Sequence, residues 1–424
     1  MIPVTAQFEI NDGCTHSCSY CYNGSHQNRN LPSNTRVAEA IAKSGVFDLT
    51  LTGGEPLLDK QFLYNAMDIF KKENVQYGIN SNLHLFEEDD VKIFREKGVK
   101  SVLTSVLGSD SKTHEKMVRK KGSFKRLMKS LDLLADSGIY LGANMVITHF
   151  NKQQVYDTGK MLVERFGIKS FTATPAIPHY DAKDKKMLTR EEHIEMLDDL
   201  LQVREDCQVY TGSLHPIVHC MFDDEQREKY EIFLNSKSCT SGRGSVAFST
   251  KGDVRVCTQE RNSYGNILVE SLEKIIQRTE HWRKNKNIPE KCKPCDYYLN
   301  CRGGCRVASK SINGTLNSPE PYSREPIRNR KIKKDETIDF PNLKITNSDM
   351  RYRIEGDRTF IIYLNPNAYA QVTKTGLDVF RRYLAGKTFE EIATETGDRE
   401  GIKKFSEVLF KSGLLKNDLS VAEV

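Results

Sequence analysis

Three closely spaced cysteines near the N-terminus are the first residues whose types and spacing suggest chemistry. Cys14, Cys18 and Cys21 stand in the stretch CTHSCSYCY with the pattern C-x3-C-x2-C, and the next cysteine is Cys207. Three thiols cannot pair off as disulfides, and a tetrahedral zinc site would need a fourth ligand nearby. Four-iron clusters do accept thiolates at such short spacings, and three thiolates would leave one iron open to a ligand that is not protein.

A second group of cysteines lies in the stretch from residue 239 to residue 305. One of them ends the sequence GDVRVC, and four follow in CKPCDYYLNCRGGC. The six are Cys239, Cys257, Cys292, Cys295, Cys301 and Cys305. A single tetrahedral zinc ion would use four of these thiols and leave two without a role. Zinc thus accounts for part of the group only, and a chance cysteine-rich patch is the other alternative to iron–sulfur binding.

The composition indicates a folded chain of about two to four domains. Hydrophobic residues make up 38% of the 424 residues, and charged residues make up 28%, close to the usual quarter. The net charge of +6 is a mild excess that does not demand a nucleic-acid partner. No apolar run approaches the roughly 20 residues of a membrane span, and the first residues lack the features of a signal peptide. Eleven cysteines without such a signal favour metal or redox chemistry in a reducing cytoplasm.

Strands and helices alternate between the two cysteine groups. Apolar, β-branched stretches such as VFDLTLTG, VQYGINSN and IKSFTATPAI have the pattern of strands, and amphipathic stretches such as FKRLMKSLDLLADSG separate them. This alternation predicts βαβ units with a parallel sheet. About six units fit before residue 180, fewer than the eight of a closed barrel. We therefore expect an α/β fold built as a partial (β/α)6 barrel similar to a TIM barrel.

Two motifs come directly after the first two expected strands. The cysteine loop follows AQFEI, and a Gly-Gly-Glu-Pro turn follows the second strand. The residues of this turn are Gly53, Gly54, Glu55 and Pro56. Ligands of parallel α/β sheets bind beyond the carboxyl ends of the strands, so both motifs are expected at one rim. The turn alone would be ordinary turn chemistry, and only its position after the cysteine loop makes the pair specific.

Together these motifs resemble those of the radical S-adenosylmethionine (SAM) enzymes. The resemblance implies that Cys14, Cys18 and Cys21 hold a 4Fe–4S cluster whose open iron is chelated by the amino and carboxylate groups of SAM. A reduced cluster would cleave SAM to a 5′-deoxyadenosyl radical, while the protein supplies placement and excludes water. The resemblance also implies that Tyr20 faces the adenine and that the Gly53–Pro56 turn accepts hydrogen bonds from the ammonium group of SAM.

Three further positions are assigned to SAM by the same resemblance. Asn82 in INSNLHL stands where the family usually has Thr-Asn-Gly, Ser105 would bind the ribose, and Asn144 would lie nearby. The run SVLGSDSKTHEKMVRKKGSF resembles one in peptide-modifying members, although Leu107 replaces a common aspartate. A strand-end Ser or Asn also commonly satisfies a turn, which is the alternative for Ser105 and Asn144. The resemblance spans roughly residues 5–180 and identifies no catalytic acid or base.

The second cysteine group resembles the SPASM extension of radical SAM enzymes, which carries two auxiliary 4Fe–4S clusters. The stretch YGNILVESLEKII between its halves matches this extension as well. On this resemblance the ligands of the first auxiliary cluster are Cys239, Cys257 and Cys305. Those of the second are Cys292, Cys295 and Cys301.

Neither auxiliary cluster has a fourth cysteine in the expected place. The last cysteine of the family follows an acidic-Pro pair, and here SPEPYS has Ser323 in that position. Cys220 or Cys207 could complete the first cluster. Glu320 or Ser323 could close the second, or one of its irons stays open. One cluster could also be degraded or absent, so the resemblance implies one or two auxiliary clusters.

The last part of the sequence has a different character. After the basic stretch REPIRNRKIKKDE, which has the composition of a linker, short strand patterns precede three amphipathic helices. Thr388 and Glu391 form a capping-box pattern at the start of the second helix. A β-ribbon with three helices predicts a winged helix-turn-helix, and it resembles the RiPP recognition element, the leader-peptide-binding domain of pyrroloquinoline quinone biosynthesis. Its candidate recognition helix TFEEIATETG is acidic and lacks basic residues, which argues against DNA binding and leaves a purely structural cap as the alternative.

We therefore expect three domains: a radical SAM core over residues 1–215, a SPASM domain over 235–325 and a winged-helix, leader-binding domain over 335–424. The expected function is hydrogen abstraction from a ribosomally made precursor peptide in the cytoplasm, ending in an oxidative thioether or C–C cross-link. The expected partners are that peptide and an electron donor such as flavodoxin or ferredoxin, with no nucleic acid and no membrane. The alternatives are a sulfatase-type protein maturase and an iron–sulfur redox sensor that uses its winged helix.

Overall fold

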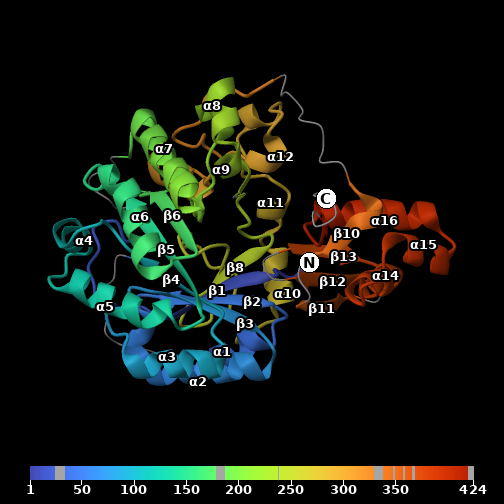
Figure 1. The fold of residues 1–424 in the computed structure, drawn as a ribbon, viewed down its shortest axis with the longest axis horizontal. Coiled ribbons are helices and arrows are strands. Elements are labelled where there is room, and N and C mark those ends of the chain that lie inside the picture. The colour runs from blue at the N-terminus through green and yellow to red at the C-terminus, as the bar shows by residue number, and fades with distance from the viewer. Residues whose placement is uncertain are drawn as a thin grey trace. The chain divides into compact units, whose positions relative to one another are not determined.

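The computed structural model describes residues 1–23, 34–177, 187–236, 238–328, 338–346, 349–356, 359–364 and 368–418. They fall into two compact units, Ile2–Arg330 and Lys331–Val424, the second together with Met1 (Figure 1). Residue 335, the expected start of the third domain, lies outside the described residues, as does part of the basic linker. Within the described ranges, no helix combines the length and the apolar character needed to cross a bilayer.

A nine-stranded sheet forms the frame of the first unit, in the order β7-β6-β5-β4-β3-β2-β1-β8-β9. The strands from β1 to β7 pair in parallel and in chain order. They are β1 (Thr5–Asn11), β2 (Asp48–Gly53), β3 (Gln76–Ser81), β4 (Ser101–Ser105), β5 (Tyr140–Ile147), β6 (Ser170–Pro175) and β7 (Tyr210–Gly212). Since six of them end by Pro175, the predicted α/β fold with about six units before residue 180 is confirmed.

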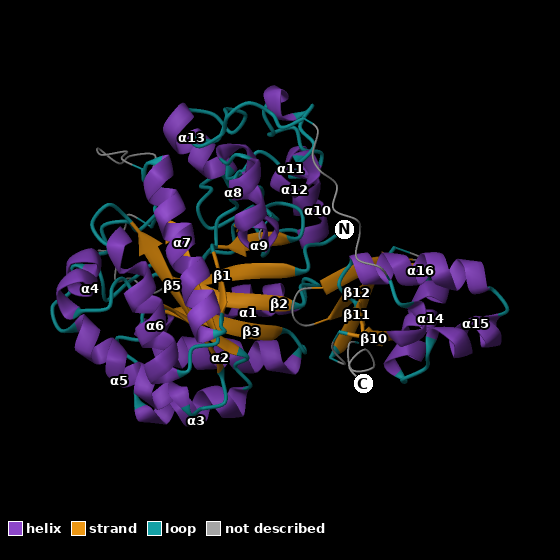
Figure 2. Cartoon of the chain, turned by 45° about the horizontal axis from the view of Figure 1, so that its top comes forward, coloured by secondary structure: helices purple, strands orange, loops and turns teal. Residues whose placement is uncertain are grey.

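Helices connect these strands and lie along the outer side of the curved sheet (Figure 2). They are α1 (Thr35–Ala42), α2 (Lys60–Lys72), α3 (Glu88–Lys97), α4 (Ser111–Val118), α5 (Ser123–Ala135), α6 (Val155–Phe166) and α7 (Arg190–Cys207). Their apolar residues recur at helical spacing, as in α5, where Leu127, Leu131 and Leu134 are buried. These faces pack on strand residues such as Phe8 to form one continuous core. The strand ends are thereby held in fixed positions at one rim.

The sheet continues into the cysteine-rich region, which the sequence patterns did not predict. Strand β8 (Ser245–Phe248) pairs in parallel with β1, and β9 (Val254–Arg255) pairs antiparallel with β8. An ion pair between Arg255 of β9 and Glu9 of β1 links the two regions. The helices here are α8 (Asp224–Lys229), α9 (Glu231–Ser236), α10 (Leu272–Gln277), α11 (Glu280–Arg283), α12 (Tyr298–Cys301) and α13 (Arg306–Asn313).

In its described residues, the second unit combines two small antiparallel sheets with three helices. Strand β10 (Leu343–Ile345) pairs with β14 (Leu415–Asn417). The other sheet has the order β11 (Met350–Glu355), β12 (Thr359–Leu364), β13 (Ala368–Val372). The helices are α14 (Lys374–Leu384), α15 (Phe389–Thr396) and α16 (Arg399–Lys411). The predicted capping box is present, because Glu391 N donates to Thr388 Oγ1 at 3.3 Å and Thr388 N donates to Glu391 Oε2 at 2.7 Å.

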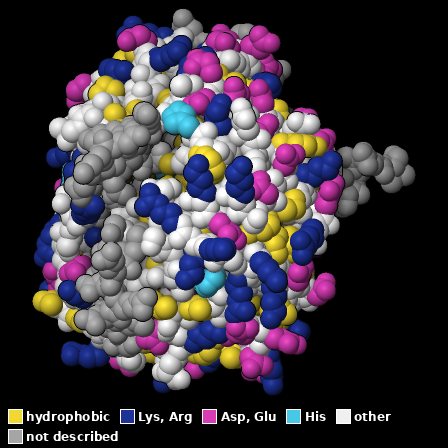
Figure 3. Space-filling model, turned by 90° about the vertical axis from the view of Figure 1, so that its left-hand side faces the viewer, with side chains coloured by type: hydrophobic (Ala, Val, Ile, Leu, Met, Phe, Trp, Pro, Cys, Tyr) yellow, Lys and Arg dark blue, Asp and Glu magenta, His cyan; other side chains and the backbone are white. Residues whose placement is uncertain are grey.

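Charged side chains are mixed on the face that lies at the left of Figure 1. Figure 3 shows this face with Lys and Arg side chains dispersed among Asp, Glu and apolar ones. This mixture agrees with the small net charge of +6.

Candidate active site

The cysteine loop after β1 is anchored by backbone hydrogen bonds to the end of α4. Ser17 N donates to Val118 O at 3.1 Å, and Ser19 N donates to Met117 O at 3.1 Å. Inside the loop, Cys21 N donates to Cys18 O at 3.3 Å, which forms a tight turn between the two thiols. The loop thus holds its three cysteines at the carboxyl end of β1, where ligands of parallel sheets bind.

The three thiols of this loop are partly buried and close enough to influence one another. Burial raises the pKa of Cys14 to about 11 and that of Cys18 to about 12, and it raises the pKa of Cys21 as well. Cys21 contributes further to the raised pKa of both other thiols. The metal-free loop therefore holds neutral thiols, and binding iron must displace their protons. Three adjacent free thiols on an anchored loop fit the donor set of a 4Fe–4S cluster with one open iron.

The Gly53–Pro56 turn lies directly against the cysteine loop. Gly54 N donates to Asn11 O at 2.8 Å, and Glu55 N donates to Gly13 O at 2.7 Å. Both glycines are required, because a Cβ on Gly53 would lie 2.3 Å from Asn11 O and one on Gly54 would lie 1.9 Å from Gly13 O. Gly53 also has φ +128°, which strains any residue with a side chain. The turn is thus shaped by its contact with the loop.

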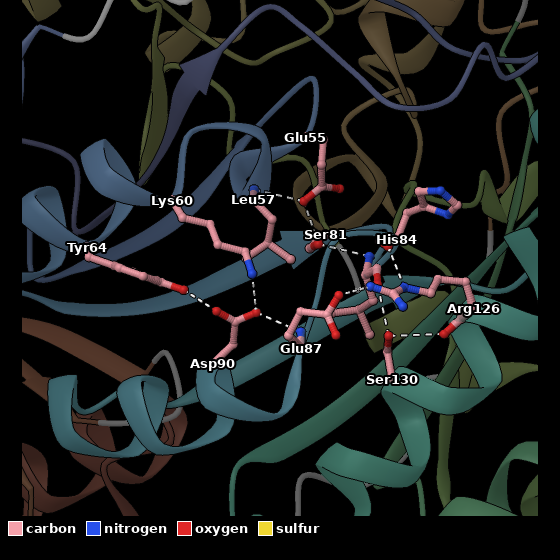
Figure 4. A network of polar contacts seen from close by, with 11 residues as sticks. Glu55, Leu57, Lys60, Tyr64, Ser81, His84, Glu87, Asp90, Arg126 and Ser130 are labelled. Atoms are coloured by element: carbon pink, nitrogen blue, oxygen red, sulfur yellow. Dashed lines mark hydrogen bonds and ion pairs between the residues drawn. The ribbon is translucent and has the colours of Figure 1, made fainter.

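The carboxylate of Glu55 ties the end of β2 to the end of β3. It is fully buried and accepts hydrogen bonds from Leu57 N at 3.0 Å and Ser81 Oγ at 2.6 Å (Figure 4). It also accepts one from Asn82 N at 2.8 Å. Burial raises its pKa, while these hydrogen bonds act in the opposite direction. Its backbone carbonyl accepts from Asn11 Nδ2 at 2.9 Å. The side chain of Glu55 therefore positions the turn, and its carbonyl already has a partner within the protein.

Asn82 joins β3 to the cysteine loop. Its Nδ2 donates to Thr15 Oγ1 at 3.1 Å and lies 3.7 Å from Cys14 Sγ. Its Oδ1 accepts from His84 N at 2.9 Å, which fixes the orientation of the amide. Because N–H groups directed at a ligating sulfur tune a metal site, Asn82 is placed to act on the thiol of Cys14.

Tyr20 packs on a small apolar cluster under the loop. Its ring contacts the cluster formed by Leu107, Met117 and Val118. Its hydroxyl shares a hydrogen bond with Cys18, which acts to lower the pKa of that thiol against the larger effect of burial. Leu107, which replaces the aspartate common in the resembled run, is fully buried here. The apolar replacement thus supports the loop, and the orientation of Tyr20 toward adenine stays a prediction.

Ser105, the last residue of β4, and Asn144, inside β5, lie side by side as register partners. Asn144 is buried, and its Oδ1 accepts hydrogen bonds from Thr172 Oγ1 at 2.9 Å and Thr174 Oγ1 at 2.8 Å. These contacts orient the amide across β5 and β6. The structure thus brings Ser105 and Asn144 together, while their contact with SAM stays a prediction.

Comparison with known proteins decides the family of this region. Residues 8–162 match the family model described as the radical SAM superfamily. This chain carries a radical SAM domain. It is therefore an enzyme whose cofactors are SAM and a 4Fe–4S cluster, as the sequence predicted.

Relatives of the radical SAM domain include enzymes with different substrates. The AdoMet-dependent heme synthase of Nitratidesulfovibrio vulgaris is 22% identical over 74% of this chain and 90% of its own length. The sporulation killing factor maturation protein SkfB of Bacillus subtilis is 27% identical over 65% of each chain. Streptococcus suis SuiB bound to SAM has a similar fold, with TM-score 0.60 and 16% identity over 76% of this chain and 77% of that one. SuiB bound to its precursor peptide SuiA gives TM-score 0.56 over 75% of each chain, at 16% identity.

A pair of histidines beside the loop of the radical SAM domain escaped sequence reasoning. His16, inside the motif CTHSC, is buried, and its ring meets that of His84 edge-on with centroids 5.3 Å apart. Burial, with His84 as the next contribution, lowers the pKa of His16 to about 3. His16 is therefore neutral at physiological pH. A histidine between two cysteines that are expected to bind iron is a signal that could have drawn attention to this pair.

All but one of the remaining cysteines of the radical SAM enzyme lie in two groups in space, which we call the first and the second auxiliary group. Cys305 lies within electrostatic reach of Cys239, Cys257 and Glu320. Burial raises the pKa of Cys305 to about 12 and that of Glu320 to about 7. Glu320 thus lies with the first auxiliary group, whereas the sequence considered it for the second.

The second group surrounds a separate cavity lined by Cys292, Cys295 and Cys301. Cys207 belongs to neither group, because it ends α7 beside Glu164 and Asp206. Of the two cysteines considered as additional ligands, the structure therefore brings only Cys220 near the auxiliary thiols.

Proposed function

We propose that this radical SAM enzyme modifies a ribosomally synthesised precursor peptide and that its second unit binds the leader part of that peptide. Two relatives support the substrate class, since SkfB is named a maturation protein and SuiB has been solved with a precursor peptide. The heme synthase is matched over 90% of its own length but over 74% of this chain. Part of this chain is therefore not matched by the heme synthase, and peptide binding would be the function of that part.

The observation that carries the proposal is the edge strand β11 of the second unit. In the three-stranded sheet of this unit, β11 is an outer strand and pairs with β12. Tyr352 and Ile354 alternate along β11 and expose 43% and 61% of their surfaces. An outer strand with exposed apolar side chains can accept an added strand, whose backbone supplies affinity and whose side chains supply specificity. A leader peptide in extended conformation fits this edge.

The first unit supplies the chemistry on this proposal. When bound, SAM and the cluster of the cysteine loop supply a hydrogen-abstracting radical. Forming a thioether or C–C cross-link removes two hydrogen atoms from the peptide, one by abstraction and one as a proton and an electron. That electron needs an acceptor, which auxiliary clusters at the two further thiol groups would supply. Epimerisation requires no net oxidation, so a cross-link accounts better for the additional thiols.

The cellular setting follows from the same chemistry. Reduced thiols and iron–sulfur clusters persist in a reducing cytoplasm, where we place this enzyme. An electron donor such as flavodoxin or ferredoxin would reduce the cluster of the cysteine loop before each cleavage of SAM.

Leader binding can be tested on β11 directly. The probe is the fluorescein-labelled leader half of a candidate precursor peptide, chosen from short open reading frames beside the gene and titrated with the full-length protein in an anisotropy assay. Ile354→Asp places a charge in the proposed contact and should weaken binding at least about tenfold, or about 1.4 kcal/mol. Val408→Asp is the matched control, since Val408 lies on α16 with 51% exposure. Equal binding by both variants would refute the role of β11.

A further inference from the structure

A cavity after β7 is lined by four cysteines. They are Cys220, Cys292, Cys295 and Cys301. Three belong to the C-x2-C-x5-C segment, whereas Cys220 comes from a much earlier part of the chain. All four are free thiols. Four thiols around one cavity match the complete ligand set of a 4Fe–4S cluster.

The turn that carries Cys220 is fixed from two sides. Cys220 is the middle residue of the 3-10 turn His219–Met221 between β7 and α8. Arg190 of α7 donates from Nε to the carbonyl of the last residue of this turn at 2.8 Å. On the other side, the ring of His219 stacks on that of Tyr297, with centroids 4.4 Å apart and an interplanar angle of 29°. Since Tyr297 belongs to the C-x2-C-x5-C segment, this stack holds the turn against the other three cysteines.

Hydrogen-bond donors and cations surround these sulfurs. Arg324 N donates to Cys220 Sγ at 3.2 Å. The backbone N–H of His219 donates to Cys301, and the side chain of Lys291 lines the cavity. N–H groups and positive charges near ligating sulfurs stabilise thiolates and the net negative charge of a cluster with four of them. The surroundings of Cys220 therefore suit a metal ligand better than an isolated buried thiol.

Ser323 lines the same cavity and competes for the fourth position. Its Oγ is buried and has no hydrogen-bond partner among the described residues. A neutral hydroxyl is a weaker ligand for iron than a thiolate, and four thiols already fill the four positions of the cluster. The cysteine that is absent at position 323 is thus replaced by one from a different element.

We propose that Cys220 supplies the fourth thiolate to the auxiliary 4Fe–4S cluster of the C-x2-C-x5-C segment. This cluster then has no iron open to substrate and is suited to electron transfer. The first auxiliary group has three thiols and Glu320, so the fourth ligand of its cluster can be something other than a thiolate. The assignment rests on the thiol positions and needs no peptide substrate, so its failure is distinguishable from a failure of the proposed function.

The test counts iron and sulfide in full-length protein whose cysteine loop is removed by Cys14→Ala, Cys18→Ala and Cys21→Ala. This background should hold about eight irons per chain from two auxiliary clusters. Adding Cys220→Ala should lower the count to about half, or leave a three-iron cluster with its own EPR signal. Adding Cys207→Ala, the matched control, should change neither the count nor the spectrum. Equal iron and equal EPR spectra in the two variants would overturn the assignment, as would a background that holds no iron–sulfur cluster.

Cys220→Ser covers the case in which the alanine variant fails to fold. Serine keeps the shape of the side chain and offers oxygen in place of sulfur, which should shift the EPR spectrum and the reduction potential of this cluster. A serine variant with an unchanged spectrum would also overturn the assignment.

Discussion

The cysteine loop after β1 and the second auxiliary group bring thiols together in different ways. The loop gathers three thiols within eight residues and is held by backbone hydrogen bonds to α4. The second group needs the fold, because Cys220 comes from a separate element, whose His219 packs on Tyr297 of the C-x2-C-x5-C segment. The loop has three cysteines, which suits an iron that must bind SAM, whereas the second group has four, which suits a closed cluster. On our proposals, a local motif thus serves the reacting site, and a long-range contact completes the cluster that accepts the electron.

The largest expected effect comes from removing the thiols of the loop. With Cys14, Cys18 and Cys21 replaced by alanine, reductive cleavage of SAM to 5′-deoxyadenosine should be abolished, because no iron remains for SAM. Iron should fall from about 12 to about two-thirds of that value, since the auxiliary clusters do not share these ligands. Chromatography of the products and iron analysis check both results. Retained formation of 5′-deoxyadenosine would mean that the cysteine loop, in contrast to the other cysteine region, is not the site of SAM cleavage.

A second variant disturbs the support of the loop without touching a thiol. The Glu55 carboxylate is buried and accepts three hydrogen bonds. Glu55→Gln puts an NH2 group, which cannot accept a hydrogen bond, in the place of one carboxylate oxygen. Leaving such buried groups unsatisfied should cost about 1–3 kcal/mol of unfolding free energy. Anaerobic denaturation in urea measures this, with Glu88→Gln at an exposed position as the control. Equal stability of the two variants would show that the Glu55 carboxylate does not hold the strand ends together.

A third variant probes the cavity beside the first auxiliary group, which Cys305, Glu320 and His193 line. Burial lowers the pKa of His193 from 6.5 to about 4. As the pH falls from 6.5 to about 4, His193 binds a proton in the unfolded chain but not in the folded one. The free energy of unfolding therefore decreases over this range as the pH falls. The contribution should be about 1.4 kcal/mol per pH unit. His193→Phe should remove this contribution to the slope of unfolding free energy against pH. Denaturation experiments between these pH values measure that slope, and an unchanged slope would contradict the prediction.

The smallest expected effect concerns Ser323, the position where the SPASM pattern has a cysteine. If Cys220 fills the fourth position, Ser323→Cys should leave iron content, EPR spectra and peptide modification unchanged within about twofold. Combined with Cys220→Ala, the same substitution should restore the iron lost by the single variant, because a thiol returns to the same cavity. Failure of this rescue, with the double variant folded, would mean that the two positions are not interchangeable.

The sequence allowed the radical SAM domain to be predicted because its motifs are local. Cysteine spacing, the glycines after the second strand and the alternation of strand and helix patterns all depend on neighbours in the chain. The carboxylate of Glu55 shows the limit, because its partners are Ser81 at the end of another strand and Asn82 directly after it. Its side chain holds the turn in place, and no spacing rule could show that.

Features that depend on distant segments could not be read from the sequence. The pairing of β8 with β1 joins residues far apart in the chain, and so does the placement of Cys220 beside Cys301. Glu320 lies with the first auxiliary group although the sequence suggested the second, and this difference has the same cause. Glu320 and Ser323 are three residues apart, yet the turn between them directs one to Cys305 and the other to the cavity of the second group.

The most direct test of the account is the mass of the peptide product. Reconstituted enzyme, SAM and a strong reductant are incubated anaerobically with the full-length precursor encoded next to the gene, and with the same precursor lacking its leader. We expect the full-length precursor to lose two hydrogen atoms for each 5′-deoxyadenosine formed, with fragmentation locating a thioether or C–C link, and the leaderless peptide to react far more slowly. Formation of 5′-deoxyadenosine with both peptides unchanged in mass would contradict the proposal that this radical SAM enzyme is a peptide maturase.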